Sequence, residues 1–365
     1  MSFWIINAFV AFLLCVFFAG IVIPQILLIA FRRNLFDEPD ERKIHTSAVP
    51  RLGGIAFKPV VLFTIVLLLG INTLLGHSSI ISTEVFNVEE MAFAYCAVMM
   101  LYLVGMADDL IGVKYSAKFF VQICCASMLI AGGLYIHNFE GIFGLNELNT
   151  WFAYPFTALV IVFIINAINL IDGIDGLCSG LCSVALAFYG ITFFVFGEYM
   201  YGLIAFSTLG VLVPFFYYNV FGNTKRGRKI FMGDTGSLTI GIILCILSLK
   251  MLSAVPVDYQ LEANPMVLAF SPIIIPCFDV IRVYFHRVRN GKNPFLPDKN
   301  HIHHKLLAIG MPQRVAMISI ICFSVLVIAF NFYVSKCMNV NVLLIIDAAI
   351  WTVFNMWLTK KIDQK

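Results

Sequence analysis

Long apolar runs recur along the whole chain and are separated by short polar segments. Five runs that contain no charged residue cover residues 5–31, 60–75, 91–107, 155–171 and 315–334. A bilayer core of about 30 Å takes roughly 20 apolar residues per helical span, and backbone groups in lipid must be hydrogen-bonded within their own segment. The pattern therefore predicts transmembrane helices.

Eleven spans are predicted, over residues 3–31, 52–75, 90–107, 117–136, 155–171, 177–197, 201–221, 235–252, 265–285, 315–335 and 340–358. The second and ninth spans have the least sharp ends, because Lys58, Asp279 and Arg282 lie near them. Connections between the spans are short, so we expect a single domain over residues 1–365. Composition agrees with an all-α polytopic transmembrane helix bundle. Of the 365 residues, 61% are hydrophobic and 12% are charged, against about a quarter charged in soluble domains.

Basic residues gather on one side of the predicted bundle. The loops near residues 32–51, 108–116, 172–176, 222–234 and 286–314, together with the C-terminal tail, lie on that side. All of the 24 Lys and Arg residues except Lys250 and Lys336 fall in or beside these segments. The positive-inside rule makes this side cytoplasmic and places the N-terminus outside.

The ten cysteines do not indicate a disulfide framework. Cys15, Cys96, Cys124, Cys125 and Cys245 lie inside predicted spans, and no CxxC pair is present. We interpret the cysteines as small apolar residues of the helix packing.

Acidic and amide side chains cluster where predicted spans reach the cytoplasmic side. An Asp at mid-span costs about 2.5–3.5 kcal/mol on insertion scales, so such clusters require an explanation. Asp108 and Asp109 end the third span, and adjacent carboxylates repel unless a cation or a shared proton relieves them. A solvated helix end is the alternative. Asn169, Asp172 and Asp175 surround the end of the fifth span, where oxygen ligands suit Mg²⁺ and interhelix hydrogen bonding is the alternative.

The start of the eighth span and the last long loop carry two further clusters. Asp234 lies between two glycines at a helix start, which offers a metal ligand and a phosphate-binding backbone, or simply an N-cap. His301, His303 and His304 lack the Cys or Glu partners of the usual zinc spacings. Beside several basic residues they favour an anion site over a zinc site.

The first loop contains a further basic group, Arg42-Lys43-Ile-His45. Cations at the level of the lipid headgroups suit a lipid phosphate. An anchor that sets the topology is the alternative.

Taken together and in this order, these residues resemble the bacterial polyprenyl-phosphate N-acetylhexosamine-1-phosphate transferases of the WecA/MraY superfamily. The matching stretches are Arg42-Lys43-x-His45, Asp108-Asp109, residues 166–176, Met232-Gly-Asp234-x-Gly-Ser237 and His301-Ile-His-His304. They extend over most of the chain, and the His-Ile-His-His form is similar to the amino-sugar branch of the family.

The resemblance implies transfer of an N-acetylhexosamine-1-phosphate from a UDP-sugar, with UDP-GlcNAc expected first, to undecaprenyl phosphate. It implies release of UMP, a requirement for Mg²⁺ with Mn²⁺ as a substitute, and a bacterial cytoplasmic membrane with the active site on its cytoplasmic face. The product would initiate lipid-linked cell-envelope polysaccharide. A homodimer is implied as well, and no nucleic-acid partner is expected.

The resemblance also assigns roles to individual residues. Asp108, Asp109, Asp172 and Asp175 are the expected catalytic residues, and Asp234 is the expected metal ligand with Asn169 as the second. The expected substrate-binding residues are Arg42, Lys43, His45, Lys118, Asn219, His301, His303 and His304. Residues 222–227 lengthen the segment between Asn219 and Asp234 relative to the family pattern.

A membrane transporter of a nucleotide-sugar or another anion is the main alternative. Transporters place their charges near the midplane, in matching halves of the chain. The clusters here lie at one membrane interface and show no such symmetry, which favours an enzyme. Both direct attack and a covalent phospho-aspartate intermediate are compatible with the sequence.

Overall fold

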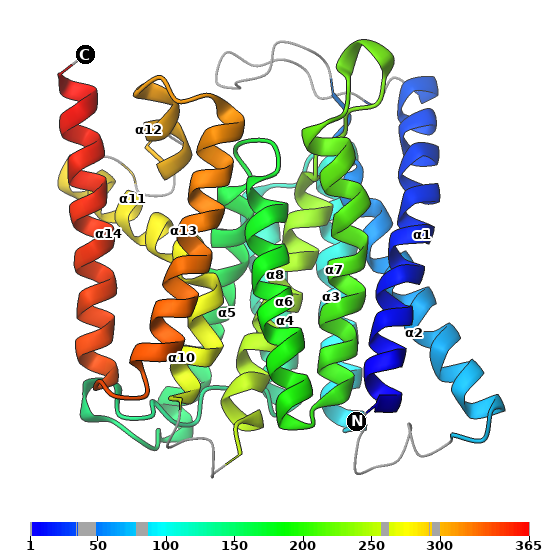
Figure 1. Ribbon diagram of the computed structural model, residues 1–365, viewed down its shortest axis with the longest axis horizontal. Coiled ribbons are helices and arrows are strands. Elements are labelled where there is room, and N and C mark those ends of the chain that lie inside the picture. The colour runs from blue at the N-terminus through cyan, green and yellow to red at the C-terminus, as the bar shows by residue number, and fades with distance from the viewer. Residues whose placement is uncertain are drawn as a thin grey trace.

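Long helices run side by side through the molecule, with the N-terminus at one end of the bundle and the C-terminus at the other (Figure 1). The computed structural model describes residues 2–33, 35, 49–77, 87–256, 263–291, 293 and 300–364. The longer helices are α1 (Ser2–Arg33), α2 (Phe57–Leu74), α3 (Val88–Ile111), α4 (Tyr115–Ala131), α5 (Thr150–Ile171), α6 (Leu177–Phe196), α7 (Tyr199–Val220), α8 (Gly233–Ala254), α11 (Ile274–Arg289), α13 (Gln313–Val334) and α14 (Val340–Asp363). The shorter ones are η1 (Gly53–Ala56), η3 (Ile142–Gly144), η4 (Thr224–Arg226), α10 (Pro265–Phe270), η5 (Ser271–Ile273) and α12 (Ile302–Ala308).

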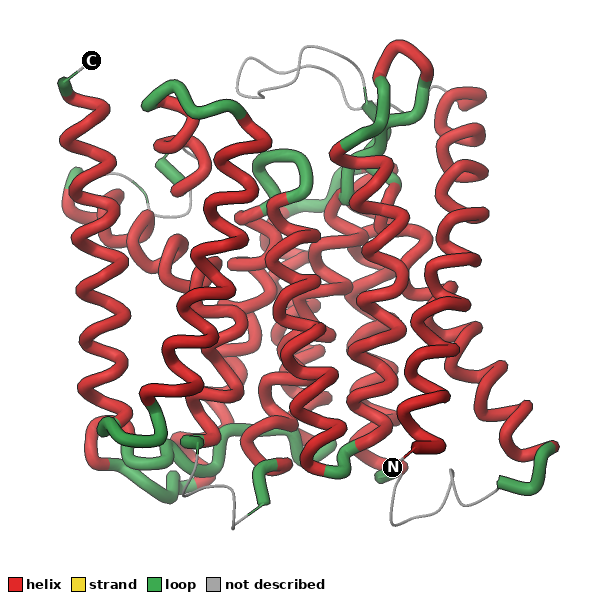
Figure 2. The backbone as a smooth tube through the Cα atoms, viewed as in Figure 1, coloured by secondary structure: helices red, strands yellow, loops and turns green. Residues whose placement is uncertain are grey.

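The described part of the chain consists of helices and connecting loops (Figure 2). Ten of its helical segments are long and apolar enough to cross a membrane, and α4 adds a shorter apolar helix. These eleven segments match the eleven predicted spans in order, which confirms an all-α polytopic membrane protein. The fourth span was predicted to reach residue 136, but α4 ends at Ala131 and residues 132–136 form a turn.

The ninth predicted span is broken into three pieces. α10 is followed by η5, which contains Pro272, and then by α11. Proline removes a backbone donor and its ring collides with the preceding turn, so a continuous α-helix is interrupted there. Figure 1 shows α11 inclined to the long helices, reaching toward α14 at the end of the bundle that carries α12.

Helix α8 lies at the centre of the bundle. Its apolar stretch is 89% buried, against 28% for the first and last spans. It packs against α3, α5 and α6. Its residues between Asp234 and Lys250 are apolar or small on every face, as expected of a fully enclosed helix. The side chains of the first turn of α8 are therefore held beside the ends of α3 and α5.

All ten cysteines are free thiols. The interpretation of the cysteines as packing residues is confirmed in this respect.

Candidate active site

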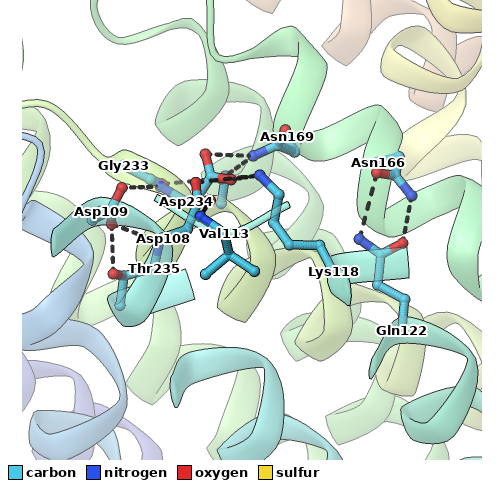
Figure 3. Close-up of polar contacts among 11 residues, drawn as sticks. Asp108, Asp109, Val113, Lys118, Gln122, Asn166, Asn169, Gly233, Asp234 and Thr235 are labelled. Atoms are coloured by element: carbon cyan, nitrogen blue, oxygen red, sulfur yellow. Dashed lines mark hydrogen bonds and ion pairs between the residues drawn. The ribbon is translucent and has the colours of Figure 1, made fainter. Parts of the chain in front are cut away.

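Polar residues from four helices, α3, α4, α5 and α8, meet at one end of the bundle (Figure 3). Helices α3 and α5 finish at this end and α8 begins there, so Asp108, Asp109, Asn169 and Asp234 come together. Asp108, Asp109 and Asp234 each offer a carboxylate oxygen within 4.8 Å of the others. Among the residues that the structure describes, this is the one grouping of three acidic, His or Cys side chains at metal-binding separation.

Asp109 caps the central helix. Its Oδ1 accepts a hydrogen bond from the backbone N–H of Asp234 at 2.8 Å, and its Oδ2 accepts from the N–H and the hydroxyl of Thr235 at 2.8 and 2.5 Å. The first N–H groups of a helix have no partner within it, and a carboxylate there also meets the positive end of the helix dipole. The N-cap that the sequence suggested for Asp234 is thus supplied by Asp109.

Gly233 makes this close approach possible. It adopts φ +72°, a conformation that side chains disfavour, and a Cβ there would lie 2.5 Å from Oδ2 of Asp109 and 2.1 Å from the carbonyl oxygen of Arg51. The Gly-Asp-Thr-Gly turn therefore places the Asp234 backbone directly on the α3 carboxylate.

Asp108 and Asp234 share one cation. The Lys118 ammonium on α4 lies 2.7 Å from Oδ2 of Asp234 and 3.2 Å from Oδ2 of Asp108. Oδ1 of Asp108 accepts a hydrogen bond from the N–H of Val113 at 2.7 Å. The ammonium offsets part of the repulsion between the two carboxylates. Lys118 was expected to bind substrate, and the structure places it at the acidic cluster.

Asn169 faces the same cluster, whereas Asn166 does not. The amide nitrogen of Asn169 donates to Oδ1 of Asp234 at 3.2 Å and to Oγ of Ser237 at 2.8 Å. Asn166 instead pairs with Gln122 of α4, with amide distances of 2.7 and 3.4 Å. The interhelix hydrogen bonding that the sequence left open is found at both residues, because Asn166 bonds to α4 and Asn169 bonds to α8. The metal role expected of Asn169 stays a prediction.

The turn after α5 is tied to the loop that precedes α8. Asp172 is the C-cap residue of α5, and Oδ2 of Asp175 lies 2.5 Å from Nζ of Lys229. The Asn219 side chain accepts from the N–H of Gly176 at 2.6 Å and donates to the carbonyl of Ile230 at 2.8 Å. Asn219 is buried and holds these two segments together, and its expected contact with the nucleotide stays a prediction.

The histidine motif lies at the start of α12, against the α5–α6 turn. A Cβ built on Gly173 would lie 2.1 Å from Nε2 of His303, so the imidazole is in contact with this turn. Burial lowers the pKa of His303 to about 3, and the neighbouring charges of His304 and His301 act in the same direction. His303 is therefore neutral at physiological pH. Arg42, Lys43 and His45 lie outside the described residues.

No specific pattern in the sequence identifies the residues that hold the predicted site residues in place. Thr235, Lys229 and Gln122 pair with Asp109, Asp175 and Asn166 through contacts that only the fold creates. For Asp279 there was a signal, because an acidic residue inside an apolar segment is costly and marks a site. Its place near the end of the ninth predicted span indicates only an uncertain boundary when the sequence is considered alone.

Comparison with known proteins places this site in a family. The family model described as glycosyl transferase family 4 matches residues 91–252. A probable undecaprenyl-phosphate N-acetylglucosaminyl 1-phosphate transferase of Bacillus subtilis (strain 168) is 31% identical over 86% of this chain and 81% of its own length. Undecaprenyl-phosphate alpha-N-acetylglucosaminyl 1-phosphate transferases of Yersinia pestis and Escherichia coli (strain K12) are 31% and 29% identical, over 80% and 87% of this chain and 74% and 79% of their own lengths. The chain therefore belongs to the family of the undecaprenyl-phosphate N-acetylglucosaminyl 1-phosphate transferases, as its motifs predicted.

Proposed function

We propose that this protein transfers N-acetylglucosamine-1-phosphate from UDP-GlcNAc to undecaprenyl phosphate and releases UMP. The reaction would take place at the cytoplasmic face of a bacterial inner membrane and initiate lipid-linked polysaccharide. The names of the relatives support the reaction class. The observation that carries the proposal is the convergence of Asp108, Asp109, Asp234 and Lys118 at one end of a membrane-spanning bundle. This arrangement suits phosphate chemistry at an interface.

The acidic cluster has the ligands that Mg²⁺ prefers. Carboxylate and amide oxygens bind this ion in proteins, usually with one or two carboxylates and the phosphates of a substrate. We propose that Asp234 holds it, with Asn169 contributing through Oδ1 and Asp108 lying next to both. When bound, Mg²⁺ would offset the negative charge of the diphosphate and stabilise the charge that develops during transfer.

The residues of this chain set the geometry of the cluster. Asp109 fixes the first turn of α8, so the backbone of Asp234 cannot shift along α3. Lys118 holds Asp234 and Asp108 in one place and can move its ammonium to a phosphate oxygen of the substrate. Phosphoryl transfer depends mainly on positioning and electrostatic stabilisation, which these contacts supply.

The proposed transfer balances without a redox partner. An oxygen of the lipid phosphate attacks the phosphorus that carries the sugar, and the bond from that phosphorus to the bridging oxygen breaks. UMP leaves with this oxygen, and the lipid diphosphate sugar retains its anomeric bond. The nucleophile is already anionic at neutral pH, so the site needs charge compensation more than a general base.

The position of the acidic cluster also argues against a transporter. Asp108, Asp109 and Asp234 lie at helix ends on one side of the bundle, whereas transporter sites lie near the midplane. Membership of a transferase family supports the same conclusion.

UMP release from purified protein in detergent tests the proposal. The expected result is release that requires Mg²⁺, undecaprenyl phosphate and UDP-GlcNAc together, and that stops when any of the three is left out. Release with another UDP-acetamido sugar and not with UDP-GlcNAc would correct the donor. No release with any such donor, from monodisperse protein, would overturn the reaction class.

A further inference from the structure

Asp279 is an acidic residue of α11 that the proposed reaction does not use. Its side chain is 0% exposed. It lies in a segment long and apolar enough to cross a membrane. A buried carboxylate in such a place is expensive unless its oxygens are paired. The contacts that pair it show what it does.

Within the part of the chain that the structure describes, the hydrogen-bond partners of Asp279 belong to the start of the histidine motif or hold it in place. Its Oδ2 lies 2.8 Å from Nδ1 of His301, and its Oδ1 accepts from the N–H of Ile302 at 3.0 Å. Arg282, one turn along α11, lies 2.9 Å from the same Oδ1 and also donates to the carbonyl of Asn300. Asp279 and its ion-pair partner Arg282 together therefore fix three successive residues, 300–302, on α11.

The contact at Nδ1 determines the protonation pattern of His301. A carboxylate only accepts hydrogen bonds, so Nδ1 must carry a proton. In the neutral imidazole Nε2 is then the acceptor, and the choice between the two tautomers is made by the group bonded to the other nitrogen. Asp279 thus sets which end of the His301 ring accepts a hydrogen bond.

The same carboxylate controls where the next histidine lies. The His303 ring is nearly parallel to that of His301, with ring centroids 5.9 Å apart. His303 is 1% exposed, and its Nδ1 and Nε2 have no hydrogen-bond partner among the residues that the structure describes. It rests on Gly173, next to Asp172. A shift of residues 300–302 would therefore move two histidines relative to the α5–α6 turn.

We propose that Asp279 is a positioning residue for the sugar-nucleotide site: it holds His301 as the Nδ1–H tautomer and fixes the start of α12 against the α5–α6 turn. The expected kinetic effect of Asp279 rests on the proposed function, whereas the tautomer of His301 is inferred from the geometry alone.

Asp279→Asn separates the two effects of the carboxylate. The amide Oδ1 still accepts from Ile302 and Arg282, but the amide nitrogen now donates toward His301. His301 must then accept at Nδ1 and carry its proton on Nε2. The variant is expected to stay folded and to raise the KM for UDP-GlcNAc about tenfold, the effect of one lost hydrogen bond. The KM for undecaprenyl phosphate should stay unchanged.

Asp347→Asn is the matched control. Asp347 is another buried carboxylate of a long apolar helix, held at 2.8 Å by Asn331 of α13. Its substitution should leave both KM values as in the wild type. An equal rise of the UDP-GlcNAc KM in both variants would show that loss of any buried carboxylate has this effect, and would overturn the positioning role.

¹⁵N imidazole spectra of His301, assigned with a His301→Asn variant, test the tautomer without any turnover. The proposal expects a protonated Nδ1 in the wild type and a protonated Nε2 in Asp279→Asn. A wild-type His301 with a bare Nδ1 would overturn it even if Asp279→Asn could not be purified. Absence of UMP release in the wild type together with the expected spectra would count against the proposed function only.

Discussion

The two neighbouring carboxylates at the end of α3 should behave differently when each is removed. Asp109 accepts three hydrogen bonds from the first turn of α8. Asp108 accepts one, from Val113, and shares Lys118 with Asp234. We therefore predict that Asp109→Ala destabilises the protein, whereas Asp108→Ala does so only slightly, although both abolish turnover.

The magnitude follows from the groups that lose their partner. Loss of an N-cap costs about 0.5–2 kcal/mol, and each donor left unpaired in a buried site costs about 1–3 kcal/mol. Water can reach part of this site, so we expect about 3 kcal/mol for Asp109→Ala. An unfolding entropy of about 2.1 cal/mol/K per residue converts this to a fall in Tm of about 4 °C for a chain of 365 residues. Asp109→Asn keeps one acceptor oxygen, so its Tm should fall by about half as much.

Intrinsic-fluorescence melting in detergent, paired with UMP release, measures both effects. The Tm of Asp108→Ala should stay within about 1 °C of the wild type, because removal of this charge also relieves repulsion with Asp234. If Asp109→Ala melts with the wild type, or if Asp108→Ala melts more than about 1 °C below it, the division of the pair into a carboxylate that caps α8 and one that does not is refuted.

Three further variants probe the site and its support. Asp234→Asn removes the central charge of the cluster at almost constant volume, so UMP release should fall by about 10³-fold or more while the melting curve stays close to that of the wild type; turnover at even a tenth of the wild-type rate would contradict the metal role. Lys250→Met leaves Glu90 buried without its cation, 3.5 Å away in the wild type, and should cost about 3–5 kcal/mol of stability. Adding Glu90→Gln should restore most of it, and a double variant no more stable than the single one would show that the charge was not the cause. The pKa of His303 is lowered in the folded state, so the native protein binds fewer protons than the unfolded chain below about pH 6.5. Stability should therefore decrease as the pH is lowered below this value, by up to about 1.4 kcal/mol per pH unit. His303→Asn should flatten this acid limb of the Tm–pH curve, whereas a variant of the exposed His286 should not.

The positions of the helices, and the gathering of Asp108 and Asp234 at one end of the bundle, could be predicted from the sequence, because both follow from simple patterns. Apolar runs of bilayer length predicted the spans, and the break within the ninth was missed although Pro272 lies inside it. Polar residues at span ends predicted that Asp108 and Asp234 lie in one site, since ends on the same membrane face share a plane.

The contacts within the site could not be predicted in the same way. The choice of Asp109 rather than Asp234 as the cap of α8 depends on the rotation of α3 about its axis. The pairing of Asn219 with Gly176 depends on how a loop returns across the bundle. Neither rotation nor loop path leaves a periodic signal in a single sequence, because the residues involved are separated by tens to more than a hundred positions.

The register between α3 and α8 is fixed at both of their ends, and this explains how an interface site stays precise in a bundle held mainly by apolar packing. At the site end, Asp109 binds the first turn of α8. At the opposite end, Glu90 of α3 accepts from the Tyr201 hydroxyl and pairs with Lys250 of α8. Along each helix the two contacts are separated by about 24–28 Å, at 1.5 Å per residue. A slip of one residue between the helices would move both contacts by about 1.5 Å, leaving a buried carboxylate poorly paired at each end, whereas apolar side chains alone would tolerate the shift far better. The Glu90–Lys250 pair therefore contributes to the position of Asp234 from the opposite end of the bundle. Its loss should lower turnover together with stability even though neither residue belongs to the acidic cluster.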